Sequence, residues 1–502
     1  MKIIKINEKD NTAVALENLK CGERIGDLTL LQDIPMGHKL ALCDIKKGEK
    51  VIKYGYPIGS AAEDIKRGSH IHTHNLKSDV AGKLSYTYKP DYTEIPETAH
   101  KTFMGYVREN GDVGIRNEVW IIPTVGCVNS VVKAIENNSK QFITENIDGV
   151  YSYNHPYGCS QLGGDMENTL KYLAGLIRHP NAGAVLVVGL GCENGNIGEL
   201  KKYLGETNCE RVKFLVSQEE KDEIEKGTEL VKELCAYAGK FKREPCDTGK
   251  LKIGLKCGGS DGFSGITANA LVGSFSDMLI SKGGASVLTE VPEMFGAETI
   301  LMNRCRTEKL FNKTVDLINN FKEYFLKYGE KTDENPSPGN KAGGITTIAD
   351  KSLGCVQKGG SAVAVSYTHL TLPTNREVED VLSYAEPVKK KGLSLLQAPG
   401  NDLVASNALA ASGCQLVLFT TGRGTPFGCP VPTAKLSSNT TLYEKKKNWI
   451  DFNAGELIEG KKMTELTNEF FDFVLKVCSG VQTKSELLDK TELAIFKDGV
   501  TL

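Results

Sequence analysis

Apolar and polar residues alternate over short runs in the first part of the chain. The apolar runs TAVAL (12–16), KLALCDI (39–45) and KVIKYGYPIG (50–59) are separated by turn-forming and charged stretches such as KCGERIG (20–26). Short strands bounded by turn residues give this pattern. We therefore expect a small β-rich domain over residues 1–78. A polar, proline-broken stretch at 79–103 is predicted to be a linker.

From residue 104 the pattern changes to a repeated order of buried strand, glycine turn and helix. Strands are predicted in VWIIPTVGC (119–127), GVYSYNHPYGC (149–159), AVLVVGLGCENG (184–195) and KFLVSQEE (213–220), with helices in 129–138 and 165–179. The same order returns from residue 249, in 251–265, 393–400 and 415–432, with a long helix at 305–329. Alternating strands and helices favour parallel sheets. The expected fold class is α/β, with domains at 104–248 and 249–502 and functional loops at the carboxyl ends of the strands.

The amino-acid composition limits the classes of binding partner that we expect. The 502 residues carry 61 basic and 63 acidic side chains, with 40% hydrophobic and 25% charged residues. This balance gives no sign of a nucleic-acid or membrane partner. The expected partner is instead a small-molecule substrate. The start MKIIKINEKDNTAV lacks the apolar core of a secretion signal, and no run of about 18 apolar residues occurs, so we expect a cytoplasmic protein. Whether it forms a homo-oligomer stays open.

One segment breaks the pattern. VSYTHLTLPTNREV (365–378) interrupts a glycine-rich passage and looks like translated adapter DNA. We interpret it as an insertion and assign no function to His369.

Fourteen cysteines without a CxxC pair do not form a disulfide framework in a reducing compartment. Cys159 and Cys192 follow predicted strands, and Cys355 lies in a later SLGC sequence. Converging thiolates would hold iron or an iron–sulfur cluster, whereas the alternative is small residues in tight turns. GLGCENG also resembles a dinucleotide loop, but its spacing is GxGxxxG, so the signal is weak.

Three histidines alternate in SHIHTHNL (69–76), namely His70, His72 and His74. On a strand they would project from one face, and neutral imidazoles at i and i+2 reach one metal ion. Exposed polar residues on a strand give the same pattern, so both interpretations remain.

Several glycine-framed loops offer polar groups for a ligand with a carboxylate or many hydroxyls. CGGSDGFSG (257–265) contains Ser260 and Asp261, and TGRGTPFG (421–428) contains Arg423, a candidate for bidentate carboxylate binding. Acidic residues follow in TEVPEMFGAE (289–298), where solvated carboxylates are the more common outcome.

Taken together, these motifs resemble the altronate dehydratase and galactarate dehydratase family. The resemblance spans nearly the whole chain through RENGDVGIRN, YNHPYGCSQLG, KCGGSDGFSGITAN, LTEVPEMFGAE, KSLGCVQKGG, QAPGNDLVAS and FTTGRGTPFG. It implies an N-terminal SAF domain of β-clip-like fold, hydro-lyase activity and a divalent metal, usually Fe²⁺, with Mn²⁺ or an iron–sulfur cluster as alternatives. The resemblance is strongest to those family members that convert D-altronate to 2-dehydro-3-deoxy-D-gluconate in galacturonate breakdown. Galactarate dehydratases and sulfolactate sulfo-lyases remain alternatives, as does a non-catalytic sugar-acid binding protein.

The family carries an aromatic residue where this chain has His70, so only the following HTHNL inherits the resemblance. The resulting hypothesis assigns metal binding to His72 and His74, with Cys159, Cys192 and Cys355 as the competing site. The remaining candidates are catalytic His155, Glu193 and Asp261, and substrate-binding Ser260, Asn269, Asn401 and Arg423.

Overall fold

The computed structural model describes residues 2–499 except 81, 93, 361–377 and 490. The predicted insertion therefore lies outside the described residues, apart from Val378, which begins strand β19 (Val378–Leu382).

The N-terminal domain is β-rich, as predicted. One antiparallel sheet has the order β1-β2-β5-β8, and a second has the order β6-β7-β9. Their bounds are β1 (Ile3–Ile4), β2 (Thr12–Ala15), β5 (Lys39–Ala41), β6 (Lys50–Lys53), β7 (Tyr56–Ala61), β8 (His70–Ile71) and β9 (Leu76–Lys77), with a small hairpin of β3 (Arg24–Ile25) and β4 (Leu28–Thr29). The strands are two to six residues long because glycine and charged turns interrupt every apolar run.

The second domain contains a parallel sheet of order β13-β12-β14-β15. Its strands are β12 (Glu118–Pro123), β13 (Gly149–Ser152), β14 (Ala182–Gly189) and β15 (Val212–Val216). Side chains of β12 alternate between two cores: Val119 and Ile121 face helices α1 (Asn129–Ser139) and α4 (Glu223–Ala238). Trp120 and Ile122 face α2 (Gly163–Arg178) and α3 (Ile197–Leu204). Burial on both faces explains the continuous apolar runs of these strands.

The C-terminal domain is built on a seven-stranded parallel sheet of order β19-β20-β18-β17-β21-β22-β23. In chain order its strands are β17 (Lys252–Cys257), β18 (Ala285–Leu288), β19, β20 (Gly392–Leu396), β21 (Leu416–Thr421), β22 (Thr433–Ser437) and β23 (Phe452–Asn453). Around the sheet lie α5 (Ala268–Ser281), α6 (Glu298–Asn303), α7 (Glu308–Lys327), α8 (Pro338–Ala342), α9 (Ile348–Cys355), α10 (Asp402–Ala411), α11 (Thr440–Lys445), α12 (Met463–Cys478) and α13 (Lys484–Leu487). The described residues thus confirm the α/β class.

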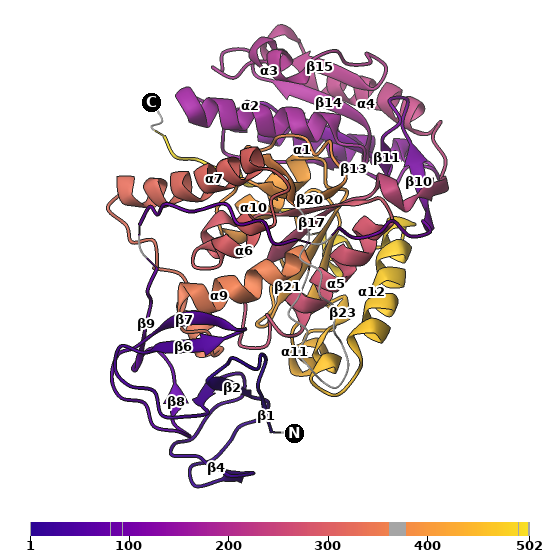
Figure 1. Ribbon diagram of the computed structural model, residues 1–502. Helices are drawn as coiled ribbons and strands as arrows, with labels where there is room; N and C mark the ends of the chain where they lie inside the picture. Colours follow the sequence, from indigo (N-terminus) through magenta and orange to yellow (C-terminus); the bar gives the residue numbers. More distant parts are fainter. Residues whose placement is uncertain (1, 81, 93, 361–377, 490, 500–502) are drawn as a thin grey trace.

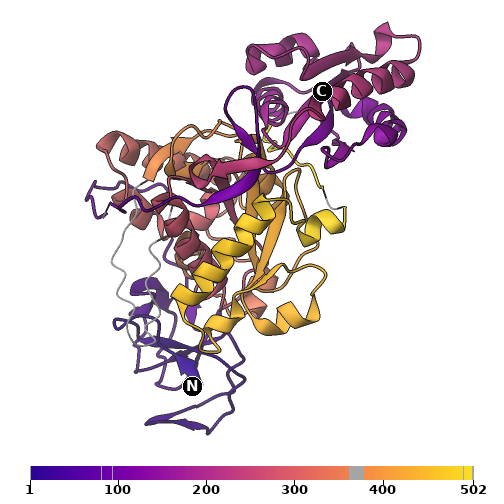
Figure 2. The same ribbon diagram turned by 90° about the vertical axis from the view of Figure 1, so that its right-hand side faces the viewer.

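The N-terminal domain and the second domain lie at opposite ends of the C-terminal domain (Figures 1 and 2). The described part of the linker runs along the C-terminal domain without helix or strand up to β10, and contacts such as Tyr88 Oη to Cys305 O at 2.7 Å hold it there. A small antiparallel sheet of β10 (Thr102–Val107), β11 (Val113–Gly114) and β16 (Glu244–Asp247) joins the start and end of the second domain. None of the described helices is long and apolar enough to cross a membrane.

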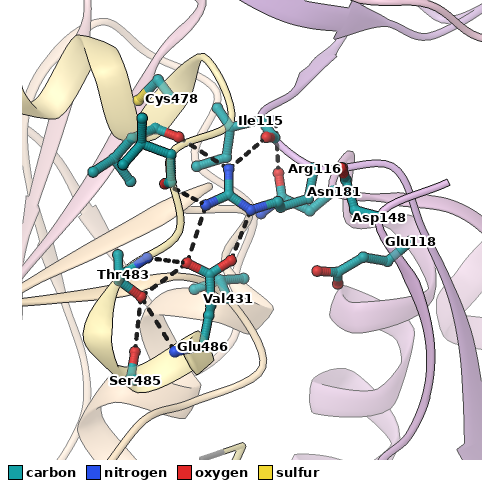
Figure 3. A network of polar contacts seen from close by, with 12 residues as sticks. Ile115, Arg116, Glu118, Asp148, Asn181, Val431, Cys478, Thr483, Ser485 and Glu486 are labelled. Atoms are coloured by element: carbon teal, nitrogen blue, oxygen red, sulfur yellow. Dashed lines mark hydrogen bonds and ion pairs between the residues drawn. The ribbon is translucent and has the colours of Figure 1, made fainter. Parts of the chain in front are cut away.

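The second domain packs tightly against the C-terminal domain. Helices α2 and α10 pack so closely that a Cβ on Gly175 would lie 2.2 Å from Ala411 O. Arg116 is buried and ion-paired with Glu486, with Nε 2.7 Å from Oε1, and it also donates to the Val477 and Val481 carbonyls (Figure 3). A buried guanidinium with this many acceptors is fully satisfied, so it fixes the position of the C-terminal segment.

Candidate functional site

The carboxyl edge of the large sheet brings together most of the glycine-rich loops. The chain leaves β17 towards β18 on one side, whereas β21 lies on the other side and leads to β22. This is a topological switch point, where open α/β sheets bind ligands. The loops after β17 and β21 meet there, because Gly422 N and Arg423 N both donate to Gly259 O at 3.0 Å.

Asp261 holds loops at this edge together by accepting hydrogen bonds from more than one of them. Its Oδ1 accepts from Ser264 N at 2.9 Å and from Ser438 Oγ at 2.8 Å, and its Oδ2 accepts from Asn439 Nδ2 at 3.1 Å. Burial raises the pKa of Asp261, which these hydrogen bonds oppose. A carboxylate with this many donors stabilises the loop after β17.

Ser260, Asp261 and Asn269 line one narrow crevice between the N-terminal and C-terminal domains. Asn269 Nδ2 donates to Gly354 O at 2.9 Å, so its amide holds α9 against α5. Ser260 Oγ is buried and has no hydrogen-bond partner among the described residues. A buried hydroxyl without a partner is costly, and a bound ligand would satisfy it. The other polar lining residues are Lys53, Tyr54, Ser264, Asp350 and Lys351.

The N-terminal domain brings two buried lysines to Asp350 of this crevice, and one of them, Lys53, lines it. Lys39 Nζ lies 2.8 Å from Asp350 Oδ2, and Lys53 Nζ lies 3.0 Å from Asp350 Oδ1. Burial alone would raise the pKa of Asp350, but the two ammonium groups lower it well below its usual range. Burial lowers the pKa of Lys39 to about 8, although Asp350 opposes this. One carboxylate of the C-terminal domain thus pairs with two lysines of the N-terminal domain.

The histidines form a cluster next to these lysines. Strand β8 ends at Ile71, so the strand is shorter than predicted, and the chain turns through His72 and His74. The rings nevertheless gather with His38, whose Nδ1 lies 3.0 Å from His70 Nε2. Ring centroids of His70 and His74 are 5.6 Å apart. The sequence hypothesis left His70 out of the metal-binding pair His72 and His74, because His70 departs from the family pattern. The structure nevertheless places His70 in the same cluster.

Burial keeps His38 and His70 neutral, and His72 is already engaged in hydrogen bonds. Burial lowers the pKa of His38 to about 4 and, with the neighbouring His38, that of His70 to about 3. His72 Nε2 bonds to Lys341 O at 2.9 Å, and its Nδ1 contacts Thr73 Oγ1 at 3.1 Å. A metal ligand needs a free ring nitrogen, so His72 would have to give up one of these bonds.

A second, buried cluster is joined to the crevice through Lys351, which pairs with Glu293. Ligand atoms of Cys257, Glu290, Glu293 and Cys355 lie within 4.8 Å of one another, an arrangement that could hold a metal ion. The acidic residues of TEVPEMFGAE were expected in solvent, but Glu290, Glu293 and Glu298 are all buried. Glu290 adopts a left-handed conformation with φ 69°, which is strained for a residue with a side chain.

Three lysines neutralise this cluster. Lys358 Nζ lies 2.7 Å from Glu290 Oε2, Lys351 Nζ lies 2.8 Å from Glu293 Oε1, and Lys256 contacts both Glu290 and Asp402. Three ammonium groups therefore face three carboxylates, and burial raises the pKa of the Cys355 thiol. A divalent ion would add charge to a network that is already balanced, so this donor set fits an internal ion-pair network better than a metal ion.

Two other candidates lie outside the crevice. Asn401 caps α10, because its Oδ1 accepts from Leu403 N and Val404 N at 3.1 Å. It also lines a separate outer cavity with Pro292 and Tyr328. Arg423 is exposed on the loop after β21.

Comparison with known proteins matches all three domains. The model of the altronate/galactarate dehydratase SAF domain matches residues 1–79. That of the D-galactarate dehydratase/altronate hydrolase second domain matches 105–239, and that of the D-galactarate/altronate dehydratase C-terminal domain matches 248–501. The chain belongs to the altronate/galactarate dehydratase family.

Individual relatives agree with this membership. The chain is 53% identical to an altronate dehydratase of Bacillus subtilis (strain 168), over 99% of each chain. It is 52% identical to an altronate dehydratase of Escherichia coli (strain K12), over 100% of each chain. Identity to the galactarate dehydratase (L-threo-forming) of Escherichia coli is 33%, over 95% of this chain and 92% of the relative.

In this dehydratase family member, His155 and Glu193 both lie in the second domain, apart from the crevice. His155 Nε2 bonds to Pro123 O at 2.8 Å, and burial lowers the pKa of His155 to about 4. Glu193 accepts from Thr124 Oγ1 and from the backbone N–H groups of Leu190 and Gly191. Both side chains are fully engaged in holding strand-end loops.

The competing cysteine site is divided. Cys159 and Cys192 are exposed on loops of the second domain. Cys355 is buried at the end of α9 in the C-terminal domain, where Cys257 Sγ lies 3.5 Å from its sulfur. The structure therefore does not bring Cys355 to the other two thiols, since they lie in different domains.

Sequence reasoning missed several residues of the site. Lys53 and Lys351 line the crevice, but isolated lysines carry no motif signal. Cys127 has a recognisable signal: it follows a strand in VGC, as Cys159 does in YGC and Cys192 in LGC. This repetition of Gly-Cys at strand ends could have identified it.

Proposed function

We propose that this enzyme removes water from D-altronate to give 2-dehydro-3-deoxy-D-gluconate in galacturonate breakdown. The observation that carries the proposal is the identity of 53% and 52% to two altronate dehydratases over almost the full length of each chain. Identity to the galactarate dehydratase is much lower, at 33%. Altronate is therefore the favoured substrate among the sugar acids.

The reaction needs cations near the substrate carboxylate. Removing the C2 proton of a 2,3-dihydroxy acid creates an enediolate-like species with two negative charges, and preorganised cations and donors stabilise it. The crevice offers the ammonium groups of Lys53 and Lys351 and the unpartnered hydroxyl of Ser260. We assign carboxylate binding to these three residues, with Asp261 and Asn269 holding the loops that carry them.

Lys351 is also the proposed acid. Burial alone would lower its pKa, but Glu293 raises it, so the ammonium form is held at neutral pH. An ammonium beside the C3 hydroxyl can protonate it as it leaves. The enol product then ketonises to the 2-keto-3-deoxy acid.

The proposed base comes from the histidine cluster. Burial lowers the pKa of His72, which the hydrogen bond to the Lys341 carbonyl opposes. The ring lies in the cluster beside Lys39, which pairs with Asp350 of the crevice lining. As a base, His72 would give up the contact of its Nδ1 with Thr73 Oγ1. A neutral imidazole can accept the C2 proton, and positioned acid–base groups typically contribute about 10²–10⁴-fold each. Iron(II), when bound, would add Lewis-acid stabilisation of the substrate carboxylate and 2-hydroxyl.

An assay of three acids tests the proposal. Purified protein, loaded anaerobically with iron, is incubated with D-altronate, galactarate or sulfolactate, and 2-keto acid formation is measured. We expect altronate to be turned over with the highest kcat/KM. Preference for galactarate or sulfolactate would contradict the substrate assignment, and binding without turnover would indicate a non-catalytic sugar-acid binding protein.

A further inference from the structure

Three Gly-Cys pairs follow three neighbouring strands of the second domain. Cys127 follows β12, Cys159 follows β13 and Cys192 follows β14. All three thiols are exposed, whereas all of the cysteines from 235 to 478 are buried. Neither the crevice nor the proposed acid–base groups use them. Small residues in tight turns would not need to place exposed thiols at corresponding positions of adjacent strands.

The topology of the sheet brings these positions to one place. Strand β12 lies between β13 and β14, and all three are parallel, so their carboxyl ends meet at the same edge. The chain passes from β12 to β13 on one side, while β14 on the other side leads to β15. This edge is therefore the topological switch point of the second domain, the usual ligand position in such sheets.

Specific contacts bind the three loops together. Gly126 N donates to Tyr157 O at 2.9 Å, which joins the first loop to the second. Thr124 Oγ1 donates to Glu193 Oε1 at 2.6 Å, which joins the first loop to the third. The glycines permit the approach, because a Cβ on Gly158 would lie 2.2 Å from Thr124 O.

The thiols also act on one another. Desolvation, followed by the neighbouring thiols of Cys159 and Cys192, raises the pKa of Cys127. Among the described residues, the three sulfurs do not all lie within 4.8 Å of one another. A single tetrahedral ion with metal–sulfur bonds of about 2.3 Å needs closer sulfurs than this.

We propose that Cys127, Cys159 and Cys192 hold an iron–sulfur cluster through three thiolates. Thiolates select iron–sulfur clusters, and a multi-iron cluster spreads its ligands more widely than one ion does. Three cysteines leave one iron without a protein thiolate, and the exposed edge leaves that position accessible. In this arrangement His155 and Glu193 are positioning residues, since they fix the loops rather than touch the cluster.

The inference goes beyond the proposed function and does not rest on it, because the cluster would lie at the sheet edge of the second domain, apart from the crevice. The presence of the cluster is measurable without turnover. An active dehydratase without a cluster would overturn this inference alone. A cluster in a protein that does not dehydrate altronate would instead overturn the proposed function.

The experiment compares cysteine variants of the full chain prepared anaerobically. Iron, acid-labile sulfide, the visible absorption of the cluster and the electron paramagnetic resonance spectrum after reduction are measured for wild type, Cys127→Ser, Cys159→Ser and Cys192→Ser. Cys209→Ser is the matched control, because Cys209 is also exposed in the second domain. A double variant, His72→Ala with His74→Ala, tests the histidine hypothesis in parallel.

We expect iron and sulfide in nearly equal amounts in wild type, Cys209→Ser and the histidine double variant. Each of the three cysteine variants should lose most of both, while circular dichroism shows a folded chain. Iron without sulfide, zinc in place of iron, or a cluster that survives the three cysteine substitutions would overturn the inference. If a single variant fails to fold, Cys→Ala at the same position and alkylation of the apo wild type provide the comparison.

Discussion

Lys39 Nζ of the SAF domain lies 2.8 Å from Asp350 Oδ2 of the C-terminal domain, and neither side chain is exposed. Lys53 approaches the other oxygen of the same carboxylate, and Lys39 also donates to Gly344 O. Charges are buried only when paired, so this triad requires the two domains to meet. The SAF domain is thereby part of the wall of the candidate active site.

Asp350→Asn should disrupt both stability and activity. The amide leaves two buried ammonium groups without a counter-charge, which typically costs about 3–5 kcal/mol. We expect a lower midpoint in urea unfolding, early proteolytic cleavage near the linker at 79–103, and loss of altronate dehydration.

Asp44→Asn is the control for this variant, because Asp44 forms an exposed ion pair with Lys66 within the SAF domain. It should leave the unfolding midpoint and activity nearly unchanged. If Asp350→Asn behaves like this control, the triad does not join the domains.

Lys351 provides a more direct test of the catalytic assignment. Lys351→Met removes the cation that lines the crevice and pairs with Glu293, and we expect kcat to fall by about 10²–10⁴-fold. Lys351→Arg keeps the charge but cannot act as an acid near neutral pH, so substrate binding should recover more than kcat does. Equal recovery of kcat and KM would indicate that Lys351 only binds the carboxylate.

The ion pair of Arg116 and Glu486 predicts coupling between the second domain and the C-terminal segment (Figure 3). Arg116→Met leaves the largely buried Glu486 carboxylate without its cation, so we expect destabilisation of about 3–5 kcal/mol in urea unfolding. Glu486→Gln combined with Arg116→Met should cost less than the sum of the single variants. Strict additivity would mean that the pair does not act as a unit.

Much of the architecture could be predicted because burial imposes a pattern on the sequence. Strand β12 is apolar on both faces since Val119 and Trp120 enter different cores, and such runs are visible without a structure. The triad of Lys39, Lys53 and Asp350 produces no such pattern in the sequence. Its members are up to 311 positions apart and pair across two domains, which no local pattern encodes.

The candidate site was predicted in part for the same reason. Ser260, Asp261 and Asn269 come from one continuous motif and line one crevice. Cys355 and Cys192 share the sequence LGC, but Cys355 ends helix α9 whereas Cys192 follows strand β14. Only the structure shows that the two cysteines belong to different sites. Glu290 was expected in solvent because its pairing lysines are distant in sequence.

Acid pH should destabilise the protein through His179. This ring is buried between the second and C-terminal domains, with Nε2 3.1 Å from Cys414 O and Nδ1 accepting from Asn181 N at 3.0 Å. Burial lowers the pKa of His179 to about 3, although the Cys414 carbonyl opposes this.

Because the unfolded chain takes up this proton below about pH 6.5 and the folded chain does not, the free energy of unfolding falls as pH drops from 6.5 towards 3. The loss from this residue reaches up to about 2 kcal/mol at pH 5. Urea unfolding between pH 8 and pH 5 measures the slope. His179→Gln should reduce the slope by the share of one residue while lowering stability at pH 8, because His38, His70 and His155, whose pKa values burial also lowers, keep their contributions. His100→Gln should not reduce the slope, because Asp247 and Glu97 raise the pKa of the exposed His100. A full acid slope in His179→Gln would place the titrating group elsewhere.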